Sequence, residues 1–303
     1  MIRDPIDSFR HAIASAGMEP PADIHGDGKI YRFSPTGKRR DDAAWYVMHL
    51  DGTPAGAFGN WRDGLAQCWC SKSEREMTPA ERTALARRVE AVKRQRDAEQ
   101  HQRHADAAAT AAIRWGAAMP AMVHPYLTTK GVRAHGVRVD GDSLLIPMRD
   151  SSGNLHSLQT IAPDGTKRFM PGGRVTGCYY SVGRPSGRIV IAEGVATAHT
   201  IFEATGIATA AAFSASNLMP VARALRGRFP CADLLIAADD DAATAGNPGR
   251  ACAEQAALAV GGVVVLPQHQ ARDPARSCDF NDLAALPGLG AVRACFAEAG
   301  ALP

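Results

Sequence analysis

The sequence predicts an α/β protein, α+β overall, with a parallel sheet in its C-terminal part. Residues 189–192 form a β-branched apolar run that ends in Glu193 and Gly194 and precedes a helix-forming stretch. The pattern recurs where residues 232–238 lead into Asp239. From Gly187 onward strands and helices alternate, which is typical of a parallel sheet. In such a sheet, ligands bind at the carboxyl ends of the strands.

The acids that follow these two strands form a candidate metal site. Glu193 follows the first strand, and Asp239 and Asp241 follow the second. Mg²⁺ favours a few carboxylates together with waters or substrate phosphates. Because successive side chains of an extended segment alternate, we expect Asp240 to point away from this site. The sequence leaves open whether Glu193 is a metal ligand or a general base.

Composition places the chain among ordinary globular proteins. It has 303 residues, enough for two or three domains, of which 46% are hydrophobic and 21% charged. A net charge of +3 permits nucleic-acid binding without requiring it. No apolar run reaches the roughly 18–20 residues of a membrane span, and no signal peptide is evident, so we expect a cytoplasmic protein. The 7 scattered cysteines fit reduced thiols.

Residues 1–76 are predicted to form an N-terminal α+β domain, with a helix over residues 1–20 and a β-rich stretch over residues 25–70. Aromatic and basic side chains recur in it, and bases stack on rings while Lys and Arg meet phosphates. These residues are therefore candidates for binding single-stranded DNA: Tyr31, Arg32, Lys38, Arg39, Trp61 and Arg62. The alternative is that such aromatics, Trp45 included, fill a small core or dock within the chain.

The pair Cys68 and Cys70 raises the question of zinc. A structural zinc site has four ligands, with Cys-x₂₋₄-Cys spacing. No second Cys or His pair follows these cysteines closely. The sequence therefore argues against zinc.

Residues 77–122 predict a long helical linker. Thr78 is a good cap, Pro79 suits the first helical position, and the helix is expected to run to about Met119. Its middle, residues 87–96, is basic. This basic stretch fits a solvated linker or a strut that contacts phosphates.

Residues 123–186 predict a β-rich basic block, with strands over residues 144–148, 155–161 and 167–170. Four basic side chains beside strand ends, and one further along the chain, are candidate nucleotide or template contacts: Arg149, Lys167, Arg168, Arg174 and Arg250. Arg168 is the leading candidate, because a planar guanidinium suits phosphate.

Residues 187–303 predict the catalytic α/β domain. After Glu193 we expect, in order, a helix over 194–205, a strand over 207–213, a helix over 214–226, a strand over 233–238, a helix over 246–258 and a strand over 262–266. Asp279 and Asp282 are candidate further metal ligands, with helix capping as the alternative. Gly246 and Gly249 would allow a close approach to phosphate.

These motifs carry a resemblance. Glu193-Gly194 with Asp239-x-Asp241 resembles the TOPRIM signature of DnaG-type primases, topoisomerases and some nucleases. The box over residues 193–198 resembles the E-G-Y-A-T-A box of plasmid-conjugation (TraC-type) and satellite-phage primases, with Val195 in place of Tyr. The similarity covers residues 123–285 and is fainter over residues 25–70.

The resemblance implies a Rossmann-like TOPRIM sheet behind a basic subdomain that lines a template cleft. It implies a DNA primase, a nucleotidyltransferase that makes short RNA primers on single-stranded DNA for replication or conjugation of a plasmid or mobile element. The acids would hold Mg²⁺ or Mn²⁺. The implied partners are single-stranded DNA, ribonucleoside triphosphates and, because the chain has no P-loop, a separate replicative helicase.

Other readings stay open. A TOPRIM nuclease would use the same acids with water, and a non-catalytic single-stranded DNA-binding accessory would keep only the fold. Tyr179 and Tyr180 leave a topoisomerase open on sequence alone, although nothing around them supports one. DnaG-type primases carry an N-terminal zinc ribbon, and this sequence departs from them there.

Overall fold

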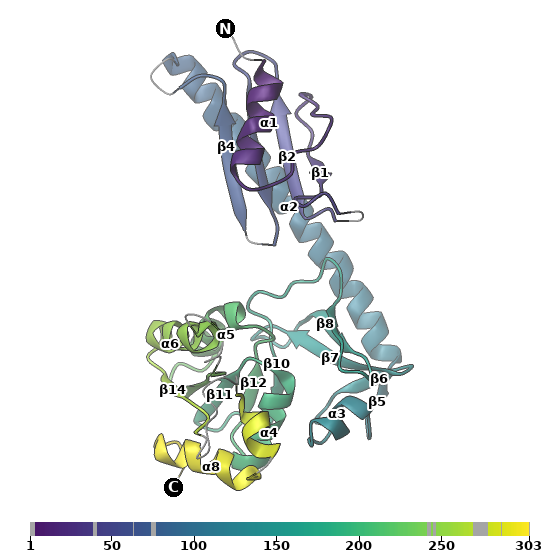
Figure 1. Ribbon diagram of the computed structural model, residues 1–303, viewed down its shortest axis with the longest axis vertical. Helices are drawn as coiled ribbons and strands as arrows, with labels where there is room; N and C mark the ends of the chain where they lie inside the picture. Colours follow the sequence, from purple (N-terminus) through teal and green to yellow (C-terminus); the bar gives the residue numbers. More distant parts are fainter. Residues whose placement is uncertain are drawn as a thin grey trace. The chain divides into compact units, whose positions relative to one another are not determined.

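The computed structural model describes residues 4–38, 41–62, 64–73, 77–240, 244, 247–268, 278–285 and 287–302. The chain divides into two compact units, residues 1–102 and residues 103–303. The boundary falls inside the long helix α2, Pro79–Ala117, so each unit contains part of this helix (Figure 1). The finer division into four domains stays a prediction.

The first unit contains one antiparallel sheet, and its strands follow chain order. Its elements are α1 (Pro5–Ser15), β1 (Tyr31–Phe33), β2 (Ala44–His49), β3 (Ala55–Asn60) and β4 (Leu65–Cys70). The predicted β-rich stretch is confirmed, whereas the first helix is shorter than expected.

Both faces of this sheet are covered, which the side chains of β2 show by their alternation. Tyr46 packs in one core with Phe9 of α1. Trp45 and Val47 pack in a second core with Val92 of α2. Trp45 is only 3% exposed, so for this ring the structure confirms the alternative that the aromatic side chains fill a small core.

The start of α2 follows the sequence signal. The side chain of Thr78 accepts the N–H of Glu81 at 3.3 Å, and the carboxylate of Glu81 accepts the N–H of Thr78 at 2.8 Å. This reciprocal pair is a capping box, which satisfies backbone donors that the first turn leaves open. The predicted helix start at Thr78 and Pro79 is therefore confirmed.

The second unit begins with the rest of α2 and an antiparallel sheet in chain order, β5 to β9. The elements are β5 (Met119–Pro120), α3 (Pro125–Thr129), β6 (Arg138–Asp140), β7 (Ser143–Arg149), β8 (Leu155–Ile161) and β9 (Lys167–Phe169). The predicted strands at β7, β8 and β9 are confirmed, whereas β5, β6 and α3 were not anticipated. His124 and Pro125 were the signal for α3, because His124 caps it through Nδ1 and Pro125 opens it.

The second sheet of this unit has the order β10-β12-β11-β13-β14, parallel except for β10. Its strands are β10 (Tyr180–Val182), β11 (Arg188–Ala192), β12 (Thr209–Ala211), β13 (Asp233–Ala237) and β14 (Val263–Val265). Its helices are α4 (Val195–Thr205), α5 (Ala215–Arg228), α6 (Pro248–Val260), α7 (Phe280–Ala285) and α8 (Leu289–Glu298). The predicted parallel sheet is confirmed, and β10 and α8 are additions to it.

Helices cover both faces of this sheet, and β11 shows why. Val190 and Ala192 lie in a core with side chains of α4, α7 and α8. Ile189 and Ile191 lie in a second core with side chains of α5 and α6. A strand buried on both faces needs a continuous apolar run, which explains the composition of residues 189–192.

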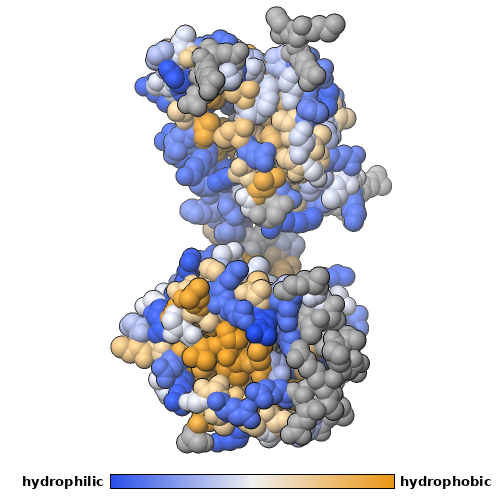
Figure 2. Space-filling view, turned by 60° about the vertical axis from the view of Figure 1, so that its left-hand side comes forward, coloured by the Kyte–Doolittle hydropathy of each residue, from blue (hydrophilic) through white to orange (hydrophobic). Residues whose placement is uncertain are grey.

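Apolar surface gathers on one side of the second unit in Figure 2. The large apolar side chains that this unit exposes include Leu258 of α6 and Val263 of the edge strand β14, 87% and 50% exposed. Among the helices that the described residues form, none has the length and the apolar character needed to cross a membrane.

Candidate active site

Strand pairing brings Glu193 and Asp239 to the same edge of the parallel sheet. β11 and β13 are neighbours, with Ala192 opposite Ala237. Glu193 is the residue after Ala192, and Asp239 is the second residue after Ala237. The two acids therefore leave adjacent strands at nearly the same height, at the carboxyl edge that the sequence predicts.

The backbone of Glu193 is held from the other side by Phe213, just beyond β12. The N–H of Phe213 donates to the carbonyl of Glu193 at 2.8 Å. Phe213 has a φ of 72°, a left-handed conformation that bulky side chains rarely adopt. Backbone strain of this kind collects at functional sites, where the surrounding structure enforces it.

Asp279 reaches the same region from the start of α7. Its Oδ2 accepts the hydroxyl of Thr197 at 3.1 Å, and Thr197 lies on α4, the helix that follows Glu193. Its Oδ1 accepts the N–H of Asp282 at 2.8 Å. Asp279 thus caps α7 and is tied to α4 at once, while Asp282 stays exposed.

The side chain of Asp240 is buried and forms a hydrogen bond within the protein. It is 8% exposed, and its Oδ1 accepts the side-chain amide of Asn247 at 2.7 Å. The backbone of Asp240 also pairs with Cys278 through hydrogen bonds of 2.9 and 3.0 Å. Asp241 and Gly246, both predicted near this site, lie outside the described residues.

Lys167 of β9 is the basic residue that the structure brings to these acids. The side chain remains exposed, but desolvation by the protein around it lowers the pKa of the Lys167 ammonium, and Lys130 adds to this effect. Asp279, Glu193 and Asp239 act in the opposite direction and raise its pKa. One cation therefore lies within the field of all three acids.

The neighbour of Lys167 faces the other way. Arg168 lines a small polar pocket with Ser143, Thr160 and Thr166. Successive side chains of a strand point to opposite faces, so Lys167 and Arg168 cannot both face the acids. The leading candidate from the sequence thus lies on the face of the sheet opposite to Lys167.

The remaining basic candidates have local partners. Arg149 donates to the carbonyl of Gly153 at 2.9 Å, and Arg174 donates to the carbonyl of Thr176 at 3.1 Å. Arg250 pairs with Glu254 at 2.8 Å, which raises the pKa of Arg250.

The DNA-binding candidates of the first unit are largely engaged within it. Arg32 pairs with Glu99 of α2 at 2.5 Å and lies 5.4 Å from the centre of the Trp61 ring. Arg62 pairs with Asp41 at 2.9 Å. Tyr31 stacks on Tyr46 with 5.4 Å between ring centres. Lys38 is exposed, and Arg39 lies outside the described residues.

Within the described ranges, no three His, Cys, Asp or Glu side chains gather closely enough to hold a metal ion. Cys68 and Cys70 lie on β4. Asp241, one of the predicted metal ligands, lies outside the described residues.

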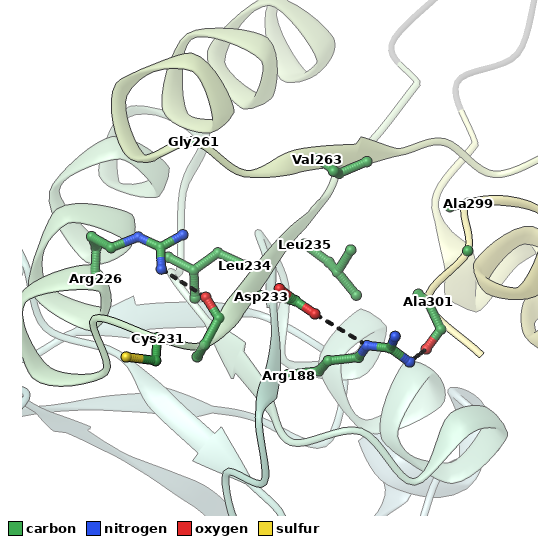
Figure 3. A pocket seen from close by; sticks show the side chains of 12 residues that line it. Arg188, Arg226, Cys231, Asp233, Leu234, Leu235, Gly261, Val263, Ala299 and Ala301 are labelled. Carbon is green, nitrogen blue, oxygen red and sulfur yellow. Dashed lines mark hydrogen bonds and ion pairs between the residues drawn. The ribbon is translucent and has the colours of Figure 1, made fainter. Parts of the chain in front are cut away.

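A pocket on the opposite edge of the parallel sheet is braced by two arginines (Figure 3). Arg188 and Asp233, the first residues of β11 and β13, pair at 3.4 Å, and Arg188 also donates to the carbonyl of Ala301 at 2.6 Å. Arg226 donates to the carbonyls of Val260 and Ala232 at 3.0 and 2.7 Å. These contacts tie helix ends to strand starts, far along the strands from the acids.

Sequence reasoning missed a buried amide that joins the site to its surroundings. Asn281 is 7% exposed and donates to the carbonyl of Lys130 at 2.7 Å and to the hydroxyl of Thr200 at 2.9 Å. It thereby links α7 to α4 and to the end of α3. Its place between Asp279 and Asp282 was the only signal in the sequence.

A buried polar network joins α4 to β10 and to His135. Nε2 of His199 lies 2.8 Å from the hydroxyl of Tyr180, which donates to the carbonyl of His135. Nε2 of His135 lies 2.7 Å from Glu203. Tyr180 is 3% exposed, and burial raises its pKa, so it lacks the access that a topoisomerase nucleophile needs.

Because His199 is buried in this network, we expect the protein to lose stability in mild acid. Burial, followed by the positive influence of His135, lowers the pKa of His199 from 6.5 to about 4. Between these values the unfolded chain takes up a proton that the folded chain excludes. We therefore expect the free energy of unfolding to be unaffected above pH 6.5 and to fall toward pH 4 by up to about 1.4 kcal/mol per pH unit.

Denaturant unfolding at several pH values between 7 and 4 measures this slope. His199→Gln should flatten it, whereas His101→Gln, at an exposed position on α2, should leave it as in the parent protein. An equal slope in all three proteins would contradict the assignment to His199.

Fold and site together define an α/β protein with an acidic site at the carboxyl edge of a parallel sheet. Residues 188–288 match the family model described as the Toprim domain. The part of the chain that carries the acids is thus similar to the Toprim domain.

Two curated relatives, both from Escherichia coli and both named DNA primase TraC, align with 87% of this chain. They are 39% and 37% identical to it, over 26% and 19% of their own lengths. The chain therefore spans about a quarter of one relative and a fifth of the other.

Solved primase structures are similar to parts of the chain. A DnaG primase catalytic domain bound to single-stranded DNA is 13% identical over 66% of this chain and 80% of that chain, with a TM-score of 0.44. A DNA primase domain from Pseudomonas aeruginosa is 18% identical over 57% of each chain, with a TM-score of 0.37.

Proposed function

We propose that this chain is a DNA primase that synthesises short RNA primers on single-stranded DNA. The observation that carries the proposal is that Glu193 and Asp239 follow adjacent strands at one sheet edge, in a chain 39% identical to a DNA primase TraC. Its substrates would be ribonucleoside triphosphates and its template a single strand of plasmid or other mobile DNA in the cytoplasm. A separate replicative helicase is the proposed partner.

The chemistry is a nucleotidyl transfer. A 3′-hydroxyl attacks the α-phosphate of a nucleotide, the bond to pyrophosphate breaks, and the hydroxyl proton leaves. Lys167 would bind the negative charge of phosphates beside the acids. Glu193, held through its backbone by Phe213, would act as the general base or as a metal ligand.

The acids suit a hard divalent cation. We propose that Mg²⁺ or Mn²⁺ is held by Glu193, Asp239 and Asp241, with Asp279 and Asp282 as further candidates, because this set offers only carboxylate oxygens. Such an ion would lower the pKa of the attacking hydroxyl and neutralise charge on the phosphates. Thr197 orients the Asp279 carboxylate through the 3.1 Å hydrogen bond.

A primer-synthesis assay tests the proposal. It combines the chain, single-stranded DNA, labelled ribonucleotides and Mg²⁺ or Mn²⁺. We expect short labelled products that Glu193→Gln abolishes. Asp233→Asn is the matched control, because Asp233 begins β13 at the opposite edge of the sheet, and it should retain synthesis.

Two results would contradict the proposal. DNA cleavage without primers would indicate a Toprim nuclease, which uses the same acids with water as the nucleophile. DNA binding without any turnover would indicate a replication accessory.

A further inference from the structure

Phe169 is an exposed aromatic ring on the same face of β9 as Lys167. β9 is the edge strand of its sheet, and residues two apart on a strand project to the same side. The ring of Phe169 contacts Phe213, whose N–H donates to the carbonyl of Glu193, so the face that carries Phe169 is turned toward this acid. Phe169 is 41% exposed, a large apolar surface for a position among charged groups.

A second ring meets Phe169 there. Phe213 lies edge-on to Phe169, with 6.1 Å between ring centres and 81° between ring planes. The backbone of Phe213 is the donor that holds the carbonyl of Glu193, and it does so in a left-handed conformation with φ 72°. Two rings from two different sheets therefore meet next to the acid that ends β11.

This arrangement has the features of a nucleobase site. Aromatic side chains next to cations bind nucleic acids because the base stacks on the ring while the cation meets the phosphate. Phe213 packs against the core and supports Phe169 from one side, which leaves part of Phe169 exposed to a ligand. The nearby ammonium of Lys167 supplies the charge that a phosphate requires.

We propose that Phe169, supported by Phe213, is a stacking surface for a nucleobase whose phosphates lie beside Lys167. The inference rests on the proposed function, because it places a nucleotide unit at the same acids. The base belongs either to the incoming nucleoside triphosphate or to the DNA strand, and the chemistry of stacking is the same for both.

Calorimetric titrations separate the two sources and do not depend on turnover. The chain is titrated with ATP and with tripolyphosphate, which has no base. In parallel it is titrated with a thymidine oligonucleotide and with an abasic oligonucleotide of equal length. We expect Phe169→Leu to weaken binding of ATP or of the thymidine oligonucleotide about tenfold, as loss of one stacked base does.

Control ligands and variants distinguish a loss of base stacking from a loss of phosphate binding. Phe169→Leu should leave the binding of tripolyphosphate and of the abasic strand unchanged, and Phe169→Tyr should restore binding of the base-containing ligand. Lys167→Gln should weaken tripolyphosphate as well. Phe229→Leu is the matched control, since this half-buried ring caps α5 ahead of β13, at the other end of the strands, and it should bind normally.

The inference is overturned if Phe169→Leu binds ATP and the thymidine strand as the parent does, or if it loses tripolyphosphate and the abasic strand equally. A parent protein that makes primers while Phe169→Leu binds normally refutes only the stacking surface. A parent protein that shows Phe169-dependent binding yet makes no primers refutes only the primase.

Discussion

Asp239→Asn should abolish primer synthesis, with a loss of roughly 10²–10³-fold or more, because charge stabilisation at a reacting phosphate is worth this much per group. Asp239 follows β13 beside Glu193, and each acid raises the pKa of Lys167. Removal of one carboxylate weakens the hold on a divalent cation and leaves the fold in place. The activity is measured with labelled ribonucleotides on single-stranded DNA.

A second readout of the same variant does not depend on activity. A cation that binds the folded chain at one hundred times its Kd stabilises it by about 2.7 kcal/mol. We therefore expect Mg²⁺ to raise the melting temperature of the parent protein and to do so much less in Asp239→Asn. Without the cation the variant should melt no lower than the parent, because a like charge beside Glu193 has been removed.

Asp233→Asn provides the control at the amino edge of the same strand. It should keep both primer synthesis and the response to Mg²⁺. If Asp239→Asn retained a full thermal response to Mg²⁺, Asp239 would not be a ligand.

Asn217→Ala should be the most destabilising single change in the second unit that we predict here. Asn217 is 3% exposed, and its Oδ1 accepts the N–H of Gly177 at 2.8 Å. Its Nδ2 donates to the carbonyls of Val175, Cys178 and Ala212 at 3.2, 3.0 and 2.8 Å. The loss of these bonds leaves buried backbone groups without hydrogen-bond partners. It should lower the free energy of unfolding by about 3 kcal/mol.

Denaturant unfolding of Asn217→Ala and of Asn154→Ala measures this effect. Asn154 is the matched control, because its amide donates to Asp150 at 3.1 Å at an exposed turn, and it should change the free energy by well under half as much. Equal losses in both variants would show that burial does not set the cost.

Local patterns in the sequence were enough to predict most strands and helices of the region that matches the Toprim domain. A strand covered on both faces must be apolar throughout, so residues 189–192 and 233–237 could be recognised as strands. Glu193 and Asp239 interrupt these runs at their carboxyl ends, and the alternation of strands with helices implied a parallel sheet. These two patterns are enough to assign the acids to one edge of the sheet.

Faces were harder to assign than strands. Alternation along β9 puts Arg168 on one face and Lys167 and Phe169 on the other, and only the tertiary structure shows which of the two faces meets the acids. In the first unit, Trp45 is buried in a core that includes Val92 of α2, so its burial depends on the packing of α2 against the sheet. Neither result is contained in the spacing of residues within a single strand.

What the sequence by itself determined is thus the four strands of the parallel sheet from β11 to β14, the start of α2 at Thr78, and the acids that follow β11 and β13. The tertiary structure decided which partners meet across the chain, such as Asn217 with Gly177, 40 residues away, and Asn281 with Lys130, 151 residues away. It also decided the left-handed turn at Phe213 and the meeting of Phe213 with Phe169. The physical reason is that strand and helix periodicity reflects local burial, whereas these contacts exist only after distant segments have packed.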